Sequence, residues 1–386
     1  MSRIVVWSPN YWPEPIGIPP LVTQAAEWLA ARGHEVDVVT AVPNYPDRVV
    51  EPAYRGVWRR SAERNGVRVH RHWLRVRPEE RFVDKALYEA SFALSSLPTY
   101  LARARRADAV VCVVPSVLAA AVAASLPRRA RLVVWVQDVV SAAARSLERP
   151  PARALTAIAR LERAAVRRAD HVVVCSPGFA PLLDAPRGRT STIPNWVDTD
   201  EIVARAPAAN GRPTRFLYAG NLGYTQGFET LLAAARAVDG VELRLVGAGN
   251  AAADVRCAAG AFASVSPPVE RAELPDLLAS ADVQLVVQRR VSGGANLPSK
   301  IATYLASGRP ILAAIDVDTP AASLLRESGG AVLVPPEDPA ALANAMAGLR
   351  DDPERRAELG RRGRRFAETR LAREVVLPRL EAAILG

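Results

Sequence analysis

Two glycine-rich turns are the first candidates for a ligand site. Gly220-Asn-Leu-Gly-Tyr-Thr-Gln-Gly227 follows a strand-like apolar run and precedes a helical stretch, and Val246-Gly-Ala-Gly249 follows the next such run. Glycines let the backbone approach a ligand, and a helix N-terminus offers free N–H groups with a partial positive charge. Each turn alone also fits an ordinary strand-to-helix connection, and its spacing matches neither a Walker loop nor the dinucleotide fingerprint. Two such turns at the carboxyl edge of one sheet favour a nucleotide site.

Lys300 is the second candidate. It ends the segment Gly293-Gly-Ala-Asn-Leu-Pro-Ser-Lys300, and Lys85 is the only other lysine among 50 Lys and Arg residues. A lysine kept where arginine is the default cation indicates a need for a compact point charge, such as a phosphate contact. A lysine on a helix surface is the alternative interpretation.

Two further segments follow strand-like runs in the first half of the chain. The loop Pro9–Gly17 carries Tyr11 and Glu14 between prolines, and stiff polar loops of this kind often hold substrate. Gln137 and Asp138 end another run, where a carboxylate could bind a substrate hydroxyl or cap a helix.

The histidines and cysteines exclude several enzyme classes. The chain has four histidines and no HExxH, CxxC or Gly-x-Ser-x-Gly pattern, so zinc peptidase and α/β-hydrolase functions lack their residues. His70 and His72 alternate in a strand-like stretch without a third metal ligand nearby. The three cysteines each lie in or beside an apolar run, so we expect buried thiols in a reducing cytoplasm.

Short apolar runs that alternate with helical stretches must position these segments. Most runs are unbroken, which is typical of parallel strands covered on both faces and predicts a doubly wound α/β fold. The expected strands are Ile4–Trp7, Val36–Thr40, Val110–Val114, Leu132–Val136, His171–Cys175, Arg215–Ala219, Glu242–Val246, Val283–Val287 and Ile311–Ala314. The expected helices are Leu21–Ala31, Phe82–Arg106, Val117–Ala124, Glu229–Ala237, and Asp352–Leu385 with an interruption or kink at Pro378.

A loop-rich stretch at residues 195–213 divides the chain, because a fresh strand–loop–helix unit begins just after it. We expect an N-terminal domain at residues 1–196 and a C-terminal domain at residues 197–370. A C-terminal helix at residues 371–386 is expected to pack back on the N-terminal domain. Both domains should be Rossmann-like and face each other across a cleft.

The formal net charge is +10, from 50 basic and 40 acidic residues. Nine arginines against three acids lie between Arg55 and Arg81, with Trp58 and Trp73 among them and an apolar helical stretch after them. This combination suits an anionic membrane surface or a lipid-diphosphate acceptor, and a solvated basic surface over a core helix is the alternative. No nucleic-acid module is recognisable, so nucleic acid is not an expected partner. Without a signal peptide or membrane span, we expect a cytoplasmic protein, peripheral at the inner face of the membrane.

The ordered motifs resemble the retaining glycosyltransferases of family 4, whose GT-B fold has two facing Rossmann-like domains. The resemblance covers nearly the whole chain and is closest to the bacterial polysaccharide subgroup of fucosamine and colanic-acid transferases. The matching pieces are Pro-Glu-x-x-Gly at 13–17, Arg-Gly-His-Glu-Val at 32–36, Ala-Val-Pro-Asn-Tyr-Pro at 41–46, Ile-Pro-Asn-Trp-Val-Asp at 193–198, Gly-Asn-Leu-Gly…Gln-Gly at 220–227, Val-Gly-Ala-Gly at 246–249, Leu-Pro-Ser-Lys at 297–300 and Tyr-Leu-Ala-Ser-Gly-Arg-Pro at 304–310.

The resemblance implies that the second domain binds a nucleotide-sugar donor and the first binds the acceptor. It implies catalytic roles for Asp138, Glu14 and Lys300. The implied donor-binding residues are Gly220, Asn221, Gly223, Gln226, Gly247, Gly249, Arg289, Asn296, Ser299, Lys300 and Thr303. The implied acceptor-binding residues are Asn10, Tyr11, Glu14, Gly17, Gln137 and Asp138.

Five positions depart from the family pattern. Asn221 and Gln226 stand where the family usually has Arg and Lys, although a glutamine is common in this subgroup. Ala295 and Thr303 replace a Glu pair whose second member normally holds the ribose hydroxyls, and Gln137 replaces a histidine.

The predicted function is transfer of a sugar from a UDP- or GDP-sugar to an acceptor hydroxyl, on a lipid-linked glycan or a small molecule. Retention is expected by analogy, and no metal or other cofactor is expected, because helix dipoles and cations can neutralise the departing diphosphate. Lys300 with Arg289 or Arg290 would supply the positive charge. Two alternatives remain at this point: a nucleotide-sugar epimerase of the same fold, and a non-catalytic homologue that binds a sugar nucleotide or a membrane.

Overall fold

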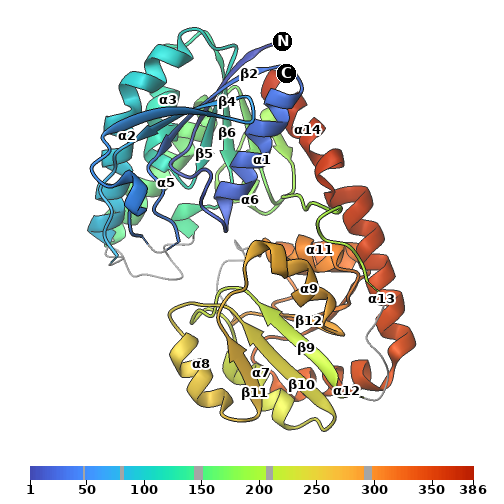
Figure 1. Cartoon of the computed structure of the whole chain (residues 1–386). Helices are drawn as coiled ribbons and strands as arrows, with labels where there is room; N and C mark the ends of the chain where they lie inside the picture. The colour runs from blue at the N-terminus through green and yellow to red at the C-terminus, as the bar shows by residue number, and fades with distance from the viewer. Residues whose placement is uncertain (47, 79–81, 143–150, 206–211, 291–297) are drawn as a thin grey trace. The chain divides into compact units, whose positions relative to one another are not determined.

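A computed structural model describes residues 1–46, 48–78, 82–142, 151–205, 212–290 and 298–386. Its internal contacts divide the chain into two units (Figure 1). The first unit contains Met1–Pro194 and Val376–Gly386, and the second contains Asn195–Val375. The sequence places the corresponding breaks at residues 196 and 370. No helix in the described part of the chain is long and apolar enough to cross a membrane.

The first unit is built on an eight-stranded sheet in the order β3-β4-β2-β1-β5-β6-β7-β8. All neighbouring strands are parallel except β3, which pairs antiparallel with β4. The strands are β1 (Arg3–Trp7), β2 (Glu35–Ala41), β3 (Arg59–Arg64), β4 (Val67–His72), β5 (Ala109–Val114), β6 (Arg131–Val136), β7 (His171–Val174) and β8 (Thr190–Thr192). The order from β4 to β7 is that of a Rossmann fold, with its switch point between β1 and β5.

Helices cover both faces of this sheet, as its unbroken apolar strands require (Figure 1). The helices are α1 (Ile18–Ala31), α2 (Phe82–Ala104), α3 (Val117–Ser125), α5 (Ala152–Arg168), the short α6 (Phe179–Leu182) and the end of α14 (Arg373–Leu385), with 3₁₀ turns at Pro52–Tyr54 and Arg187–Arg189. On one face Trp7 of β1 stacks on Tyr100 of α2 with ring centroids 4.0 Å apart. The indole N–H of Trp7 donates to Ser96 Oγ at 2.9 Å, which satisfies a polar group inside the core.

The second unit has an all-parallel six-stranded sheet in the order β11-β10-β9-β12-β13-β14. Its strands are β9 (Thr214–Ala219), β10 (Val241–Val246), β11 (Ala263–Ser266), β12 (Val283–Val287), β13 (Ile311–Ala314) and β14 (Ala331–Val334). Leu217 packs on one face with α10 (Lys300–Ala306), while Phe216 and Tyr218 pack on the other with α7 (Phe228–Arg236), so successive side chains enter two different cores. This two-sided burial explains why the strand is apolar without alternation.

Three helices of the second unit begin at residues whose side chains cap them. Thr319, Asp338 and Asp352 each precede a proline, and each side chain accepts a hydrogen bond from a backbone N–H of the first turn. The helices are α7 (Phe228–Arg236), α8 (Ala252–Ala259), α9 (Leu274–Ala279), α10 (Lys300–Ala306), α11 (Pro320–Ser328), α12 (Pro339–Asp351) and α13 (Pro353–Phe366), with a 3₁₀ turn at Arg271–Glu273 and a π-helical turn at Ala367–Leu371.

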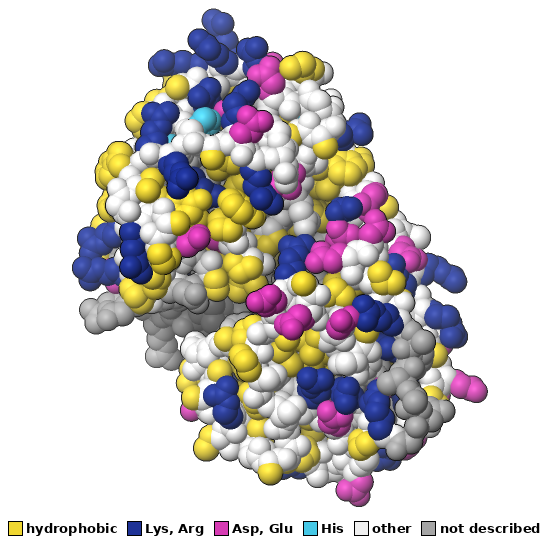
Figure 2. All heavy atoms as spheres, viewed as in Figure 1, with side chains coloured by type: hydrophobic (Ala, Val, Ile, Leu, Met, Phe, Trp, Pro, Cys, Tyr) yellow, Lys and Arg dark blue, Asp and Glu magenta, His cyan; other side chains and the backbone are white. Residues whose placement is uncertain are grey.

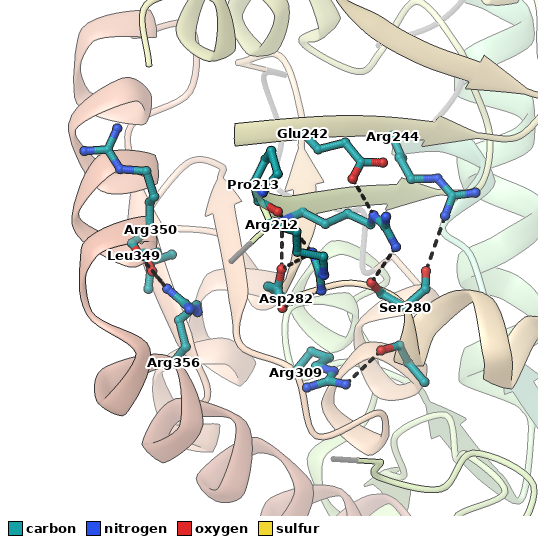
Figure 3. Close-up of polar contacts among 12 residues, drawn as sticks. Arg212, Pro213, Glu242, Arg244, Ser280, Asp282, Arg309, Leu349, Arg350 and Arg356 are labelled. Carbon is teal, nitrogen blue, oxygen red and sulfur yellow. Dashed lines mark hydrogen bonds and ion pairs between the residues drawn. The ribbon is translucent and has the colours of Figure 1, made fainter. Parts of the chain in front are cut away.

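Arginines stabilise the amino edge of the second sheet (Figure 3). Arg212 donates twice to Asp282, at 2.8 and 3.1 Å, and the backbone N–H of Arg215 donates to the same carboxylate at 2.8 Å. The Arg215 guanidinium donates to Glu242 at 2.8 Å and to the carbonyl of Ser280 at 3.1 Å. Arg309 donates to the carbonyl of Ala279 at 2.8 Å. Part of the arginine content therefore binds strand ends together and needs no anionic partner outside the chain.

The structure confirms the nine predicted strands to within one residue at each end and corrects two expectations. Pro378 lies inside α14, and the interruption comes earlier, at the π-helical turn and the extended residue Ala372. The reason is pairing: Ala372 forms a bridge with Val197, whose N–H donates to the carbonyl of Leu371 at 2.9 Å. Cys112 and Cys175 are buried as predicted, but Cys257 on α8 is exposed.

Candidate active site

The switch point of the second sheet lies between β9 and β12, and the two glycine turns follow β9 and its neighbour β10. The turns bind each other through the backbone. Gly220 N donates to the carbonyl of Val246 at 2.9 Å, Leu222 N to that of Ala248 at 2.8 Å, and Ala251 N to that of Leu222 at 2.9 Å. The two turns therefore form one double loop at the carboxyl edge of the sheet.

The glycines of this double loop are required by close packing between its halves. A Cβ added at Gly247 would lie 1.8 Å from the carbonyl oxygen of Gly220, and one at Gly249 would lie 2.4 Å from that of Leu222. At Gly220 a Cβ would lie 2.8 Å from Lys300 Nζ. Gly247 and Gly249 thus serve the fold of the loop, whereas Gly220 leaves the space that Lys300 occupies.

Gln226 closes the first turn from within. The side-chain Oε1 of Gln226 accepts a hydrogen bond from Gly223 N at 3.0 Å, and the backbone N–H of Gln226 donates to the carbonyl of Gly223 at 3.1 Å. Asn221 is exposed, and no hydrogen bond of its side chain is found within the described ranges. The side-chain amide of Asn221 is therefore available to a ligand, while the Oε1 atom of Gln226 is engaged within the loop.

Lys300 is the first residue of α10, and its Nζ lies 3.6 Å from the centroid of the Tyr218 ring. The side chain is half-buried, and no described carboxylate forms an ion pair with it. Desolvation lowers the pKa of Lys300 to about 7. Tyr304 fixes the helix that carries this cation, because its hydroxyl accepts from Ala219 N and donates to Ala219 O, both at 2.8 Å. A desolvated ammonium held by a π-face and lacking a counter-ion favours binding of an anion.

Among the other predicted donor residues, one forms an ion pair within the chain, two lie at α10 and one lies outside the described residues. Arg289 follows β12, but its guanidinium donates to Glu229 at 2.5 Å in an exposed ion pair of the kind that contributes little to stability. Ser299 is exposed and Thr303 half-buried at α10. Ala295 and Asn296 lie outside the described residues.

In the first unit the Glu14 carboxylate faces inward, 5% exposed. It accepts hydrogen bonds from Asn10 Nδ2 at 3.0 Å, from Asn44 N at 3.0 Å and from Tyr45 N at 2.9 Å. Burial raises the pKa of Glu14, and these hydrogen bonds act in the opposite direction. Through these hydrogen bonds Glu14 joins the loop after β1 to the loop after β2. Contact between Glu14 and a substrate stays a prediction.

The loop after β1 is also held by Arg71, whose position in the basic stretch Arg55–Arg81 gives no sign of this role. Arg71 is 4% exposed and donates to the carbonyls of Trp12 and of Ala41, the latter at 3.1 Å. Tyr11 is buried, and its hydroxyl has no hydrogen-bond partner among the described residues. Gly17 is exposed just before α1. A buried hydroxyl without a partner is a candidate for binding a polar ligand.

Asp138 follows β6 at the carboxyl edge of the first sheet. Its side chain is exposed and forms no described hydrogen bond. Although the residue is exposed, neighbouring protein atoms displace part of the water around its carboxyl group, and this raises the pKa of Asp138 to about 6. Gln137 beside it is buried, and its Nε2 has no hydrogen-bond partner among the residues that the structure describes.

Glu162 of α5, and not Asp138, caps the backbone that follows β6. Its carboxylate accepts from Val140 N at 2.7 Å and from Ser141 N at 3.1 Å. Glu162 therefore leaves Asp138 free and fixes the backbone just after it. In the described ranges no three His, Cys, Asp or Glu side chains gather closely enough to hold a metal ion.

Solved structures define the class of protein. The chain is similar over 99% of its length to sucrose-phosphate synthase from Thermosynechococcus elongatus, with a TM-score of 0.76, 20% identity and 98% of that chain covered. HepE of Anabaena, solved with UDP-glucose, gives a TM-score of 0.70 at 14% identity, with 99% of both chains covered. WaaG, a glycosyltransferase involved in lipopolysaccharide biosynthesis, also gives 0.70 at 14% identity, over 99% of this chain and all (100%) of its own. Two Rossmann-like units and these neighbours define the GT-B fold.

Family models and one relative then identify the family. Residues 17–196 match a glycosyl transferase 4-like domain, and residues 213–352 match glycosyl transferases group 1. WcaI of Escherichia coli (strain K12), named as a colanic acid biosynthesis glycosyl transferase, is 30% identical over 379 residues, with 90% of this chain and 91% of WcaI covered. The chain belongs to the family 4 glycosyltransferases and is a glycosyltransferase of the colanic-acid type.

Proposed function

We propose that this glycosyltransferase takes its sugar from a UDP- or GDP-sugar bound by the second unit and transfers it to a hydroxyl of an acceptor bound by the first. The position of Lys300 is the main observation that supports this proposal. Lys300 is a half-buried cation without a described counter-ion, next to Gly220 and at the switch point where β9 ends. The diphosphate of a sugar nucleotide has the charge and size to fill that position. The UDP-glucose complex of HepE shows that a protein of this fold binds such a donor.

In the proposed reaction the bond between the anomeric carbon and the diphosphate oxygen breaks, and the acceptor oxygen bonds to the same carbon on the same face. Negative charge develops on the departing diphosphate, and the Lys300 ammonium stabilises it at a site poor in water. The leaving phosphate oxygen takes the proton of the acceptor hydroxyl, so the transfer retains the anomeric configuration and requires neither metal nor cofactor. Asp138 binds a hydroxyl of the sugar or the acceptor.

The acceptor is a lipid-linked glycan, with a small-molecule aglycone as the alternative. The names of WcaI and WaaG place those two proteins in colanic acid and lipopolysaccharide biosynthesis. A surface of the first unit supports the choice of a lipid-linked acceptor. Val83, Leu87 and Leu94 are exposed at helical spacing along α2, and Leu94 is 72% exposed.

Two tryptophans extend this exposed apolar surface. Trp58 is 63% exposed and stacks on Trp73 with centroids 5.2 Å apart. Ser95 of α2 donates to the carbonyl of Trp73 at 2.5 Å, which brings the pair against the helix beside Leu94. Tryptophans next to arginines and an apolar stripe are suited to the interface of an anionic bilayer, so peripheral binding at the cytoplasmic face of the membrane is part of the proposal.

The donor site is tested by titrating UDP and GDP into the wild type and Lys300→Met by calorimetry. Methionine keeps the length and apolar body of the side chain and removes its charge. We expect at least tenfold weaker binding of the preferred diphosphate, because a charge-assisted hydrogen bond contributes roughly 1.5–3 kcal/mol. Lys85→Met removes the other lysine of the chain and serves as the charge control. Equal affinity of the wild type and Lys300→Met would refute the role of Lys300.

The membrane surface is tested separately with the double variant Trp58→Ala/Trp73→Ala and vesicles containing 30% phosphatidylglycerol. Leu161→Ala/Leu182→Ala removes two other exposed apolar side chains of the first unit and is the control. We expect the tryptophan pair, and not the leucine pair, to be needed for vesicle binding, and we expect the binding to weaken with salt. Absence of vesicle binding by the wild type would remove the membrane from the proposal.

A further inference from the structure

A pocket of about 660 Å³ lies in the first unit beside the amino-terminal halves of β1 and β2. Its apolar lining includes Ile4 and Val5 of β1, and Pro98 and Ala102 of α2. Asp138, in contrast, follows the carboxyl end of β6. The volume is within the usual range for small-molecule sites, roughly 300–1,000 Å³. Neither the family match nor the proposed reaction assigns a ligand to this pocket.

Arginine dominates the lining of the pocket. Two carboxylates, Glu35 and Asp37, face six guanidinium groups, which belong to Arg3, Arg59, Arg68, Arg103, Arg105 and Arg106. Figure 2 shows Lys and Arg side chains gathered at the end of the first unit that carries the amino terminus. The excess of positive charge makes the pocket a focus for anions.

The two carboxylates are already engaged by three of these arginines. Asp37 accepts from Arg68 Nη2 at 2.8 Å and contacts His70 Nε2 at 2.7 Å, and Arg103 Nε lies 3.7 Å away. Burial opposes ionisation of Asp37, but the hydrogen bonds from His70 and Arg68 prevail and hold the pKa of Asp37 below its usual range. Glu35 lies 3.5 Å from Arg3 and 3.3 Å from Arg68.

Arg59, Arg105 and Arg106 have no carboxylate partner in the part of the chain that the structure describes. They come from two elements, because Arg59 begins β3 and the other two follow the end of α2. Cations near a helix C-terminus also stabilise the helix dipole, which could account for Arg105 and Arg106 without a ligand. That explanation leaves Arg59, which comes from a different element, and the open volume unexplained.

We propose that this pocket binds a phosphorylated anion with at least two negative charges, a diphosphate or phosphate-ester group, through Arg59, Arg105 and Arg106. Guanidinium groups match phosphate oxygens in bidentate geometry, and three of them can share one diphosphate. The group belongs to a soluble metabolite or to a lipid headgroup, which present the same chemistry to the pocket. This binding is independent of the donor site, because the proposed donor residues belong to the other unit.

The test titrates inorganic pyrophosphate into the full chain at saturating UDP, which blocks the proposed donor site, and repeats the titration with Lys300→Met. The variants are Arg59→Gln and Arg105→Gln/Arg106→Gln. Arg361→Gln/Arg362→Gln removes two exposed arginines of α13 and is matched to the double variant in charge. We expect pyrophosphate binding that persists with UDP, weakens at least tenfold in Arg105→Gln/Arg106→Gln and also weakens in Arg59→Gln, but not in the control.

The same variants are then tested on vesicles of phosphatidylcholine with and without 30% phosphatidic acid. A pyrophosphate effect without a vesicle effect supports a soluble ligand, and a vesicle effect that requires phosphatidic acid supports a lipid headgroup. The proposal is overturned if neither assay separates the pocket variants from the control. It is also overturned if Arg105→Gln/Arg106→Gln lowers the melting temperature and leaves both binding assays unchanged, since the arginines would then serve α2 alone.

Discussion

Binding of a nucleoside diphosphate near pH 8 is expected to take up a proton at Lys300. The pKa of Lys300 is lowered to about 7 in the free protein. A diphosphate beside the ammonium would return the pKa towards its ordinary value of about 10.4. At pH 8 the free side chain then holds roughly 0.1 proton and the bound one nearly 1, so each binding event takes up about 0.9 proton.

The same equilibrium makes the affinity fall as the pH rises. Only the protonated form of Lys300 binds strongly, and its fraction in the free protein decreases about tenfold per pH unit above 7. Between pH 7.5 and 9 the dissociation constant of UDP should therefore increase about 25-fold. The second phosphate pKa is about 6, so UDP itself is fully ionised over this interval and contributes no slope.

Calorimetry measures both quantities. The observed enthalpy at pH 8 is compared in two buffers with different ionisation enthalpies, which yields the number of protons taken up, and the dissociation constant is followed from pH 7.5 to 9. Lys300→Met should show neither proton uptake nor pH dependence. The reasoning is refuted if the wild type takes up no proton at pH 8 and binds equally well at pH 7.5 and 9.

The pH dependence of stability without nucleotide tests the lowered pKa of Lys300 independently. The folded-state pKa of Lys300 lies below the unfolded value, so between about pH 7 and 10.4 the unfolded chain binds more protons than the folded one. The contribution of Lys300 to stability therefore rises with pH across that window. Lys300→Met should melt at a higher temperature than the wild type at pH 7, and the difference should shrink towards pH 10.

Two further predictions concern the loops that hold the site. Gly247→Ala would place a Cβ 1.8 Å from the Gly220 carbonyl, so we expect it to cost about 1–3 kcal/mol of unfolding free energy and to weaken UDP binding. Gly348→Ala, in open space on α12, should stabilise by about 0.5–1 kcal/mol in the same denaturant titration, and equal effects of the two would contradict the packing argument. Glu162→Gln turns a donor towards backbone N–H groups that now meet a carboxylate, so we expect a lower kcat with little change in the donor KM, and a loss of about 1–3 kcal/mol in stability. A melting point that falls while kcat stays unchanged would show that Glu162 supports the fold and does not position Asp138.

Nine of the fourteen described strands could be predicted from the sequence, because the rule that governs them is local. A strand covered on both faces places successive side chains in two cores and is therefore mostly apolar without alternation, and β9 shows this with Phe216 and Leu217 in different cores. β3 escaped prediction because its residues Arg59–Arg64 are exposed or half-buried, and its register comes from antiparallel pairing with β4. The amino-acid composition of a strand that is stabilised only by pairing with its neighbour does not identify it as a strand.

The candidate site could be predicted in position but not in detail. The sequence indicates that the glycines make room for a ligand, whereas the structure shows that Gly247 and Gly249 are needed because two loops meet there. Glu162 reaches the amides after Asp138 from 22 residues away, and Arg71 reaches the loop after β1 from 59 residues away. Contacts at such separations leave no pattern in one sequence, because only the fold brings the partners together.

The environment of residue 300 explains why a lysine is retained there in an arginine-rich chain. Apart from Lys85, the chain elsewhere uses arginine as its basic residue, and arginine forms fixed hydrogen bonds such as the pair from Arg212 to Asp282. An arginine at position 300 would remain charged when no ligand is present, because the pKa of a guanidinium group lies above 12. A lysine can lose its proton there and so avoid part of the cost of a desolvated charge without a counter-ion. Lys300→Arg should therefore melt below Lys300→Met without nucleotide, and any UDP binding that it retains should be independent of pH between 7.5 and 9. A pH dependence in that variant equal to the wild type's would assign the titration to a group other than Lys300.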